Sequence, residues 1–213
     1  MKKIKVLLIV LVCLAAVGGV AAVAQLRTTP EHPFRQEDLG GEVLARYKDY
    51  EITRSTVDDY LRQMDYLIGD TADGGSAREG DREIIDSMLK GTILYEEAVA
   101  RGCTATQEDV DSAMEAIKTA YYENWSGSED IDEYCAFMGI TVEEYFDLLA
   151  EQMPRTLSRQ NLKDAVGREY CEAHGIEFTK MNQPAEIQTY VQNYIDDLFR
   201  SHAAEIVYDT SVS

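Results

Sequence analysis

The side chains best suited to catalysis or metal binding are few and widely spaced in this chain. It contains four cysteines and three histidines, at positions Cys13, Cys103, Cys135, Cys171, His32, His174 and His202. A zinc site needs several such ligands at short, regular spacing, and no C-x-x-C or similar pair occurs. We therefore expect no metal site and no cofactor. The three cysteines beyond Cys13 leave two alternatives open, one structural disulfide or buried thiols.

No sequence motif indicates an enzyme. The chain lacks a nucleophile elbow, a phosphate-binding Gly-rich loop, an H-E-x-x-H helix and a dinucleotide fingerprint. We therefore expect no catalytic residues and no small-molecule substrate. The net charge of −19, from 39 acidic and 20 basic residues, repels phosphate backbones and argues against binding to nucleic acid.

The N-terminal residues predict a membrane-targeting segment. Lys2, Lys3 and Lys5 precede the uncharged residues 6–24, a run long enough to approach the hydrocarbon thickness of about 30 Å. The lysines favour a cytoplasmic N-terminus, which places the rest of the chain on the extracytoplasmic side. The length favours a retained single-pass anchor in the cell membrane. The Ala22-Val23-Ala24 triplet favours the alternative, a signal peptide cleaved after Ala24 and a secreted protein.

Residues 25–41 contain two prolines and end in two glycines, which indicates a flexible spacer. We place the folded domain at 42–210 and expect a mostly α fold. The expected elements are strands at 43–47 and 50–53 around a Lys48-Asp49 turn, helices at 54–68, 81–101, 107–124, 130–138, 142–173 and 185–203, and a strand at 204–208.

Two local patterns give the clearest predictions. Gly139 ends one helix, and Thr141 with Glu144 three residues later forms a capping box that begins the next. In the last helix, apolar residues recur at helical spacing, at Ile187, Tyr190, Val191, Tyr194, Ile195, Leu198 and Phe199. We expect this wide apolar face to pack back onto the earlier helices, and the strand at 204–208 to pair within 43–53.

A set of short motifs lies in a fixed order along these elements, at Leu89, Leu94, Glu97, Ala98, Gly102, Val110, Gly139, Thr141, Glu144 and Tyr145. With the order of the elements, these residues resemble the N-terminal chaperone domain of SurA- and PrsA-type extracytoplasmic foldases. The resemblance covers about 43–175 and the closing helix and strand at 184–208. Two features depart from the family: Lys48-Asp49-Tyr50 replaces the usual Asn-Gly turn, which suggests a wider hairpin, and residues 175–184 leave no room for a parvulin isomerase domain.

The resemblance implies a chaperone that binds unfolded or exported polypeptides without prolyl isomerase activity. Aromatic and Met side chains suit such promiscuous contact because they offer large areas of adaptable shape. The candidate client-binding residues are Tyr121, Tyr122, Trp125, Tyr134, Phe137, Met138, Tyr145 and Phe146. Each of them can instead fill the core between neighbouring helices. The alternative function is an envelope scaffold that binds one defined partner through the same surface.

Overall fold

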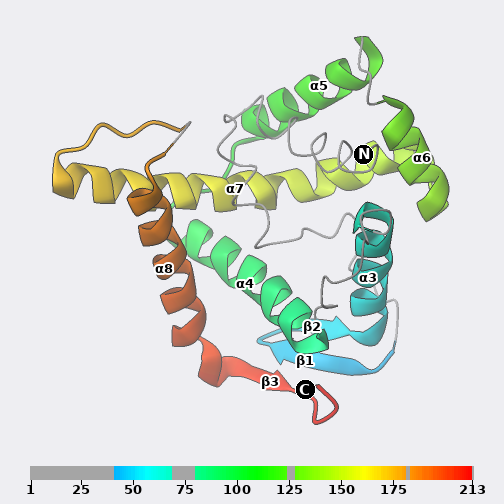
Figure 1. Ribbon diagram of the computed structural model, residues 1–213, viewed down its shortest axis with the longest axis horizontal. Helices are drawn as coiled ribbons and strands as arrows, with labels where there is room; N and C mark the ends of the chain where they lie inside the picture. Colours follow the sequence, from blue (N-terminus) through cyan, green and yellow to red (C-terminus); the bar gives the residue numbers. More distant parts are fainter. Residues whose placement is uncertain (1–40, 69–79, 124–127, 181–182, 213) are drawn as a thin grey trace.

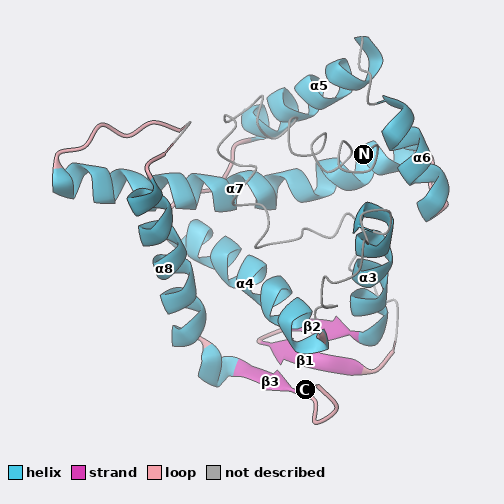
Figure 2. Cartoon of the chain, viewed as in Figure 1, coloured by secondary structure: helices cyan, strands magenta, loops and turns pink. Residues whose placement is uncertain are grey.

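The computed structural model describes residues 41–68, 80–123, 128–180 and 183–212. Within these residues the fold is mostly helical with one small antiparallel sheet, which confirms the expected fold class (Figures 1 and 2). The elements are β1 (Val43–Tyr47), β2 (Tyr50–Thr53), α3 (Arg54–Ile68), α4 (Asp81–Ala100), α5 (Gln107–Glu123), α6 (Ser128–Met138), α7 (Val142–His174), α8 (Ala185–Ser201), the 3-10 turn η2 (Ala203–Glu205) and β3 (Ile206–Tyr208). The proposed membrane segment at 1–24 lies outside the described residues.

The sheet has the strand order β2-β1-β3, so the two ends of the domain meet on β1. Tyr47 pairs directly with Tyr50, which makes the hairpin loop two residues long. The expectation of a wider hairpin was therefore wrong. Lys48 adopts a φ of 53°, a left-handed conformation that glycine normally supplies in such turns. Its ammonium group bonds to Glu96 on α4 at 2.5 Å, a contact that holds the turn.

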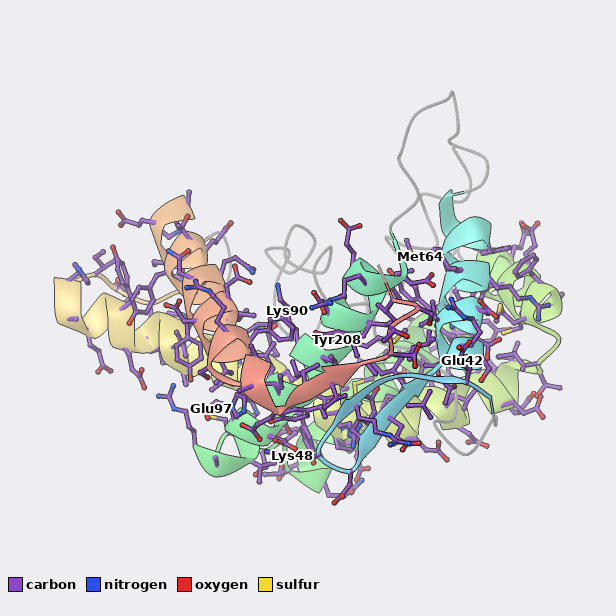
Figure 3. The ribbon with its side chains drawn as sticks, turned by 90° about the horizontal axis from the view of Figure 1, so that it is seen from below. Glu42, Lys48, Met64, Lys90, Glu97 and Tyr208 are labelled. Atoms are coloured by element: carbon purple, nitrogen blue, oxygen red, sulfur yellow. The ribbon has the colours of Figure 1, made fainter. Side chains whose placement is uncertain are left out.

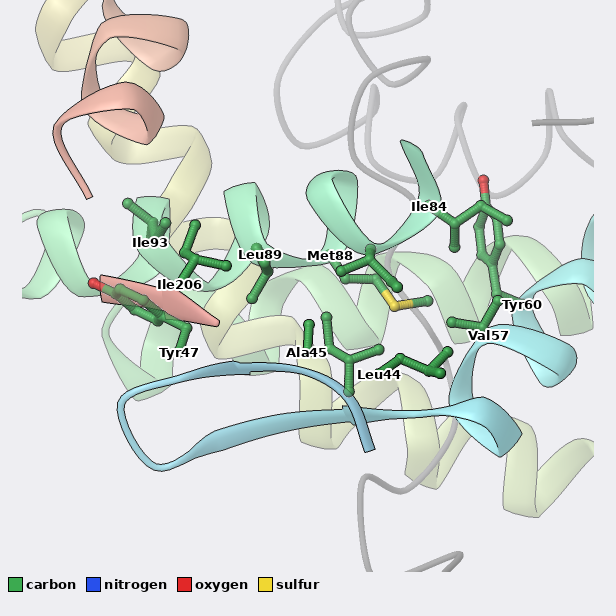
Figure 4. Close-up of a cluster of buried hydrophobic side chains, with 12 residues drawn as sticks. Leu44, Ala45, Tyr47, Val57, Tyr60, Ile84, Met88, Leu89, Ile93 and Ile206 are labelled. Carbon is green, nitrogen blue, oxygen red and sulfur yellow. The ribbon is translucent and has the colours of Figure 1, made fainter. Parts of the chain in front are cut away.

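One face of the sheet is covered by α3 and α4. Leu44 and Tyr47 from β1, Val57 from α3 and Leu89 from α4 are all fully buried in this sheet cluster (Figure 4). Ile206 of β3 belongs to the same cluster, so the C-terminal strand is part of the sheet core. Leu44 and Ala45 of β1 are both buried, and this break in the alternation of inward and outward residues coincides with a register shift between Val43 and Ala45 in the pairing with β2.

The long helix α7 joins the two halves of the molecule. Helices α5 and α6 pack against its N-terminal half, and α4 and α8 pack against the half nearer its C-terminus (Figure 1). The helix continues through Pro154, which lacks the N–H that a helix interior uses. Ser158 Oγ donates to the Pro154 carbonyl at 2.6 Å and accepts from the Ala105 N–H at 2.9 Å, which ties the α4–α5 connection to α7.

The predicted boundary between α6 and α7 is confirmed. Gly139 has a left-handed φ of 75°, and the Ile140 N–H donates to the Cys135 carbonyl at 3.0 Å. The turn at Gly139 therefore provides a hydrogen-bond donor for a carbonyl group at the end of α6. Glu144 Oε2 accepts from the Thr141 N–H at 2.7 Å, and Thr141 Oγ1 accepts from the Glu144 N–H at 3.2 Å. These reciprocal bonds are the predicted capping box.

The closing helix packs as predicted. Ile187, Val191 and Ile195 are buried against α4 and α7, and Lys90 of α4 bonds to Asp196 of α8 at 2.9 Å. The helix ends at Ser201 rather than at 203, because the His202 N–H turns back to the Phe199 carbonyl and η2 follows. The strand accordingly begins at Ile206 rather than at 204, and it pairs with β1 as expected.

Side-chain contacts attach the C-terminal strand to α4. The Tyr208 hydroxyl donates to Asp86 Oδ1 at 2.7 Å, and the Arg82 guanidinium lies 3.4 Å from the centre of the Tyr208 ring. Seen from below, Tyr208 on β3 lies beside α4 (Figure 3). The first and last strands therefore share both a sheet and a supporting helix.

Candidate functional site

A continuous series of aromatic rings in edge-on and tilted contact crosses the part of the molecule built by α3, α6, α7 and α5. We call it the aromatic ladder; its rings, in order, are Phe137, Tyr66, Tyr134, Tyr145, Phe146, Tyr121 and Tyr122. Successive ring centres from Phe137 to Tyr121 lie 4.8, 5.4, 6.0, 5.7 and 5.4 Å apart. These separations fall in the range in which aromatic pairs attract one another.

The middle of the aromatic ladder is core. Tyr134, Tyr145 and Phe146 are buried together with Met114 and Met153. Burial favours the core-packing alternative for these three candidate residues, because a client polypeptide cannot reach their rings in this conformation. Met138 and Tyr121 are half-buried against the same cluster.

The two ends of the aromatic ladder reach the surface. The exposed fraction is 41% for Phe137 and 64% for Tyr122. Helix α3 supports the first end, since Arg62 donates to the Phe137 carbonyl at 3.0 Å and its guanidinium lies 5.4 Å from the ring centre. Phe146 supports the second end, 6.1 Å from the Tyr122 ring centre. Trp125 lies outside the described residues.

A hydrogen bond between α5 and α6 fixes the orientation of Tyr121. Its hydroxyl donates to Asp132 Oδ1 at 2.6 Å. This bond to a carboxylate, followed by burial, raises the pKa of Tyr121 to about 12. The ring therefore stays neutral at physiological pH and holds Tyr122 in an edge-on contact 4.9 Å away.

Tyr66 is a member of the aromatic ladder that the sequence did not identify. It contacts both Tyr134 and Phe137 and is 7% exposed. The spacing of apolar residues in α3 identifies the helix face that covers the sheet, and this face carries Val57 and Tyr60. The contact of Tyr66 with α6 is a tertiary one, and nothing local in the sequence marks it.

A second cluster combines residue types used in acid–base chemistry. The Tyr47 hydroxyl donates to Glu96 Oε2 at 3.0 Å and lies 3.1 Å from His202 Nδ1, which is also 2.8 Å from Glu205. Since the Tyr47 proton goes to Glu96 and the Glu205 carboxylate can only accept, His202 Nδ1 carries a proton, which lies nearer to Glu205 than to Tyr47. Tyr47 is fully buried, so no substrate reaches its hydroxyl. The cluster is suited to joining β1, α4 and the end of α8.

Electrostatics in this cluster favour the ionised form of Glu96 and the neutral form of Tyr47. Burial opposes ionisation of Glu96, but hydrogen bonds from Lys48 and Tyr47 outweigh it and lower the pKa of that carboxyl group. Burial raises the pKa of Tyr47, so its hydroxyl remains a donor. The neutral Tyr47 phenol thus donates a hydrogen bond to the Glu96 carboxylate.

A basic stripe runs along the middle of α7. Arg155 lies over the Tyr95 ring of α4 at 5.1 Å. Burial lowers the pKa of Arg159 to about 10, and burial followed by the neighbouring Arg159 charge lowers the pKa of Lys163 to about 8. The first residue of the stripe, Arg155, therefore faces α4.

The described residues contain no group of three or more acidic, His or Cys side chains arranged to hold a metal ion. Cys103, Cys135 and Cys171 are free thiols, and Cys135 and Cys171 are buried. In the part of the chain that the structure covers, none of the helices combines the length and apolar character that a membrane crossing requires.

Comparison with known proteins finds no protein family whose model matches the chain, no matching curated protein and no matching solved structure.

Proposed function

We propose that this chain is an extracytoplasmic, non-enzymatic chaperone-like protein of the SurA N-terminal type, which binds non-native polypeptides at the exposed ends of the aromatic ladder. Residues 6–24 tether it to the cell membrane, or direct its secretion if they are removed. The observation that carries the proposal is the exposure of Phe137 and Tyr122 at the ends of a buried series of rings.

The rigid interior of the aromatic ladder supports this role. An exposed ring attached to a packed core offers a client a large apolar area without the entropy loss of ordering a flexible side chain. Four helices contribute rings, so the two surface ends are held in a fixed relation by α6 and α7. Non-native chains expose the apolar side chains that such surfaces bind.

The connection between α7 and α8 supports a role without isomerase activity. An inserted domain needs about 50 residues or more, and only 175–184 separate these helices. Ile176 and Phe178 of this connection are packed against α7 and α8. Lowering the isomerisation barrier of about 18–20 kcal/mol requires an organised pocket around the X-Pro bond. We expect no acceleration of isomerisation in a Pro-containing test peptide.

Aggregation assays test the proposal directly. The full chain, in detergent or in a lipid disc, should delay the aggregation of a chemically unfolded client protein. A Phe137→Ser, Tyr122→Ser double variant should lose this effect while keeping its melting temperature. Tyr190→Ser is a matched control, because Tyr190 is as exposed as Phe137 but lies on α8. Equal protection by the double variant and the parent would contradict the proposal.

A specific observation favours the second candidate, a scaffold that binds one defined partner. The interior of the aromatic ladder is closed, since Tyr134, Tyr145 and Phe146 are at most 7% exposed. A small exposed patch of fixed shape suits a single partner better than many clients. Protection of two unrelated unfolded clients by the same chain supports the chaperone; protection of neither supports the scaffold.

A further inference from the structure

The aromatic ladder lies in the most acidic part of the chain. Residues 104–153 contain thirteen Asp and Glu residues and one basic residue, Lys118. They contribute −12 of the net charge of −19. Helices α5 and α6 and the first part of α7, which supply most of the rings, therefore create a strongly negative potential around them.

Carboxylates lie close to both ends of the aromatic ladder. At the Phe137 end, burial and then the Glu133 and Asp130 charges raise the pKa of Tyr66, whose ring contacts Phe137. At the Tyr122 end, Asp132 bonds to the adjoining Tyr121, and Glu123 is exposed next in the sequence. Each surface ring is thus accompanied by acidic groups.

The chain already places cations on these rings. Arg62 lies over the Phe137 ring at 5.4 Å, and Lys118 lies over the Phe146 ring at 5.7 Å. A cation over an aromatic face is attracted by the negative face of the ring. Within the described residues, no Lys or Arg lies over the ring of Tyr122, although it is the more exposed end.

Charge complementarity selects one kind of occupant. The negative potential repels nucleic acid, anionic lipid and acidic polypeptides. A second copy of the chain would bring the same acidic surface against itself, which like-charge contacts disfavour. A polypeptide with Lys or Arg beside apolar residues fits both features: its cations can pair with the carboxylates, and its apolar side chains can pack on the exposed rings.

We propose that the exposed ends of the aromatic ladder bind cationic polypeptide segments, in which Lys or Arg side chains lie over Tyr122 and between its neighbouring carboxylates. This inference rests on the proposed function and specifies the class of client. It also assigns Lys118 an opposing role, because its positive charge, the only basic one in residues 104–153, repels the cations of a client.

Peptides of matched length and apolar content test the inference. Three versions carry Arg, Gln or Glu at the same positions, and their binding to the full chain is followed by fluorescence anisotropy at low and high salt. We expect the Arg peptide to bind on the order of tenfold more tightly than the Glu peptide at low salt, and this ratio to fall as salt screens the charges. Lys118→Gln should increase the affinity for the Arg peptide.

Charge-reversal variants test the role of the carboxylates, and a charge reversal elsewhere on the surface is their control. Glu123→Lys with Glu133→Lys should abolish the preference for the Arg peptide. Glu177→Lys, on an exposed residue of the α7–α8 connection, should leave it unchanged. The parent chain could instead bind all three peptides equally, with this binding lost in the Tyr122→Ser, Phe137→Ser variant. That result would overturn the charge preference but would leave the proposed function standing. Binding of none of them overturns both.

Discussion

The ring of Phe178 lies directly against α7 at Gly167, and its Cε2 atom is 3.0 Å from the position that a Cβ on Gly167 would take. Phe178 belongs to the connection that runs from α7 to α8. Ile176 bonds to the Cys171 carbonyl at 2.9 Å, and Lys180 lies 3.6 Å from the buried carboxylate of Asp164. The connection therefore doubles back along α7, and Gly167 makes room for its aromatic anchor.

This contact predicts that the effect of Gly167→Ala depends on Phe178. Alanine stabilises a helix interior by about 0.5–1 kcal/mol relative to glycine. In the parent chain the displaced ring should cancel this gain, whereas in a Phe178→Ala background the gain should appear in full. Chemical denaturation of the four chains in a double-mutant cycle measures the coupling.

Gly167→Val should destabilise the parent by about 1–3 kcal/mol, because a larger side chain forces the ring out of its site. Equal effects of Gly167→Ala in the two backgrounds would show that the ring and α7 are independent.

A second prediction concerns acid stability. The folded-state pKa of Glu96 is lowered from its ordinary value of 4.5, so its interactions stabilise the fold above about that pH. This contribution is lost as the pH falls through the lower folded-state value. Glu96→Gln should therefore lower the melting temperature at pH 7 but have a much smaller effect near pH 3.

The expected change is modest because the Glu96 side chain is 40% exposed. Glu177→Gln, a change on the exposed connection, serves as the control and should shift the melting temperature little at any pH. An equal loss of stability by Glu96→Gln at both pH values would refute the electrostatic explanation.

A third prediction uses the cysteines to report on α6. Burial raises the pKa of Cys135 to about 11, and the residue is 3% exposed, so its thiol should resist alkylation at pH 8. Cys171 is 1% exposed and Cys103 is half-buried. Peptide mapping after a short alkylation should find Cys103 modified first, and all three modified in denaturant. Rapid native labelling of Cys135 would mean that α6 opens away from α7.

Local signals explain how much of this fold could be predicted from the sequence. The Thr141–Glu144 capping box involves residues three apart, and the strands of the hairpin follow from alternation over a few residues. The left-handed conformation of Lys48 could not be predicted, because it is stabilised by Glu96, which is remote in the sequence.

Only the residue types of the candidate site could be predicted from the sequence. The sequence shows that aromatic residues are concentrated at 121–146, but solvent exposure separates Phe137 and Tyr122 from the buried Tyr134 and Tyr145. This separation depends on how α3 and α6 pack, and Tyr66 at that contact has no local sequence signal.

The last prediction tests whether the C-terminal elements complete the fold. Burial of Ile187, Val191 and Ile195 contributes about 1.5–3 kcal/mol for each side chain before entropy is subtracted. The net stability of a domain is typically only about 5–15 kcal/mol. Deletion of 184–213 also removes β3 from β1 and the Tyr208 bond to Asp86. The truncated chain should therefore unfold or aggregate, as measured by circular dichroism and light scattering, and should lose any ability to hold unfolded clients.

Removal of 210–213 alone provides the control, because these residues follow β3 and leave the β1–β3 pairing intact. That shorter deletion should change the melting temperature by a few degrees at most and preserve client holding. Suppose instead that the chain without 184–213 keeps its melting temperature and still protects unfolded clients. Helix α8 would then be an independent appendage, and both the SurA-like closure and the function proposed from it would be wrong.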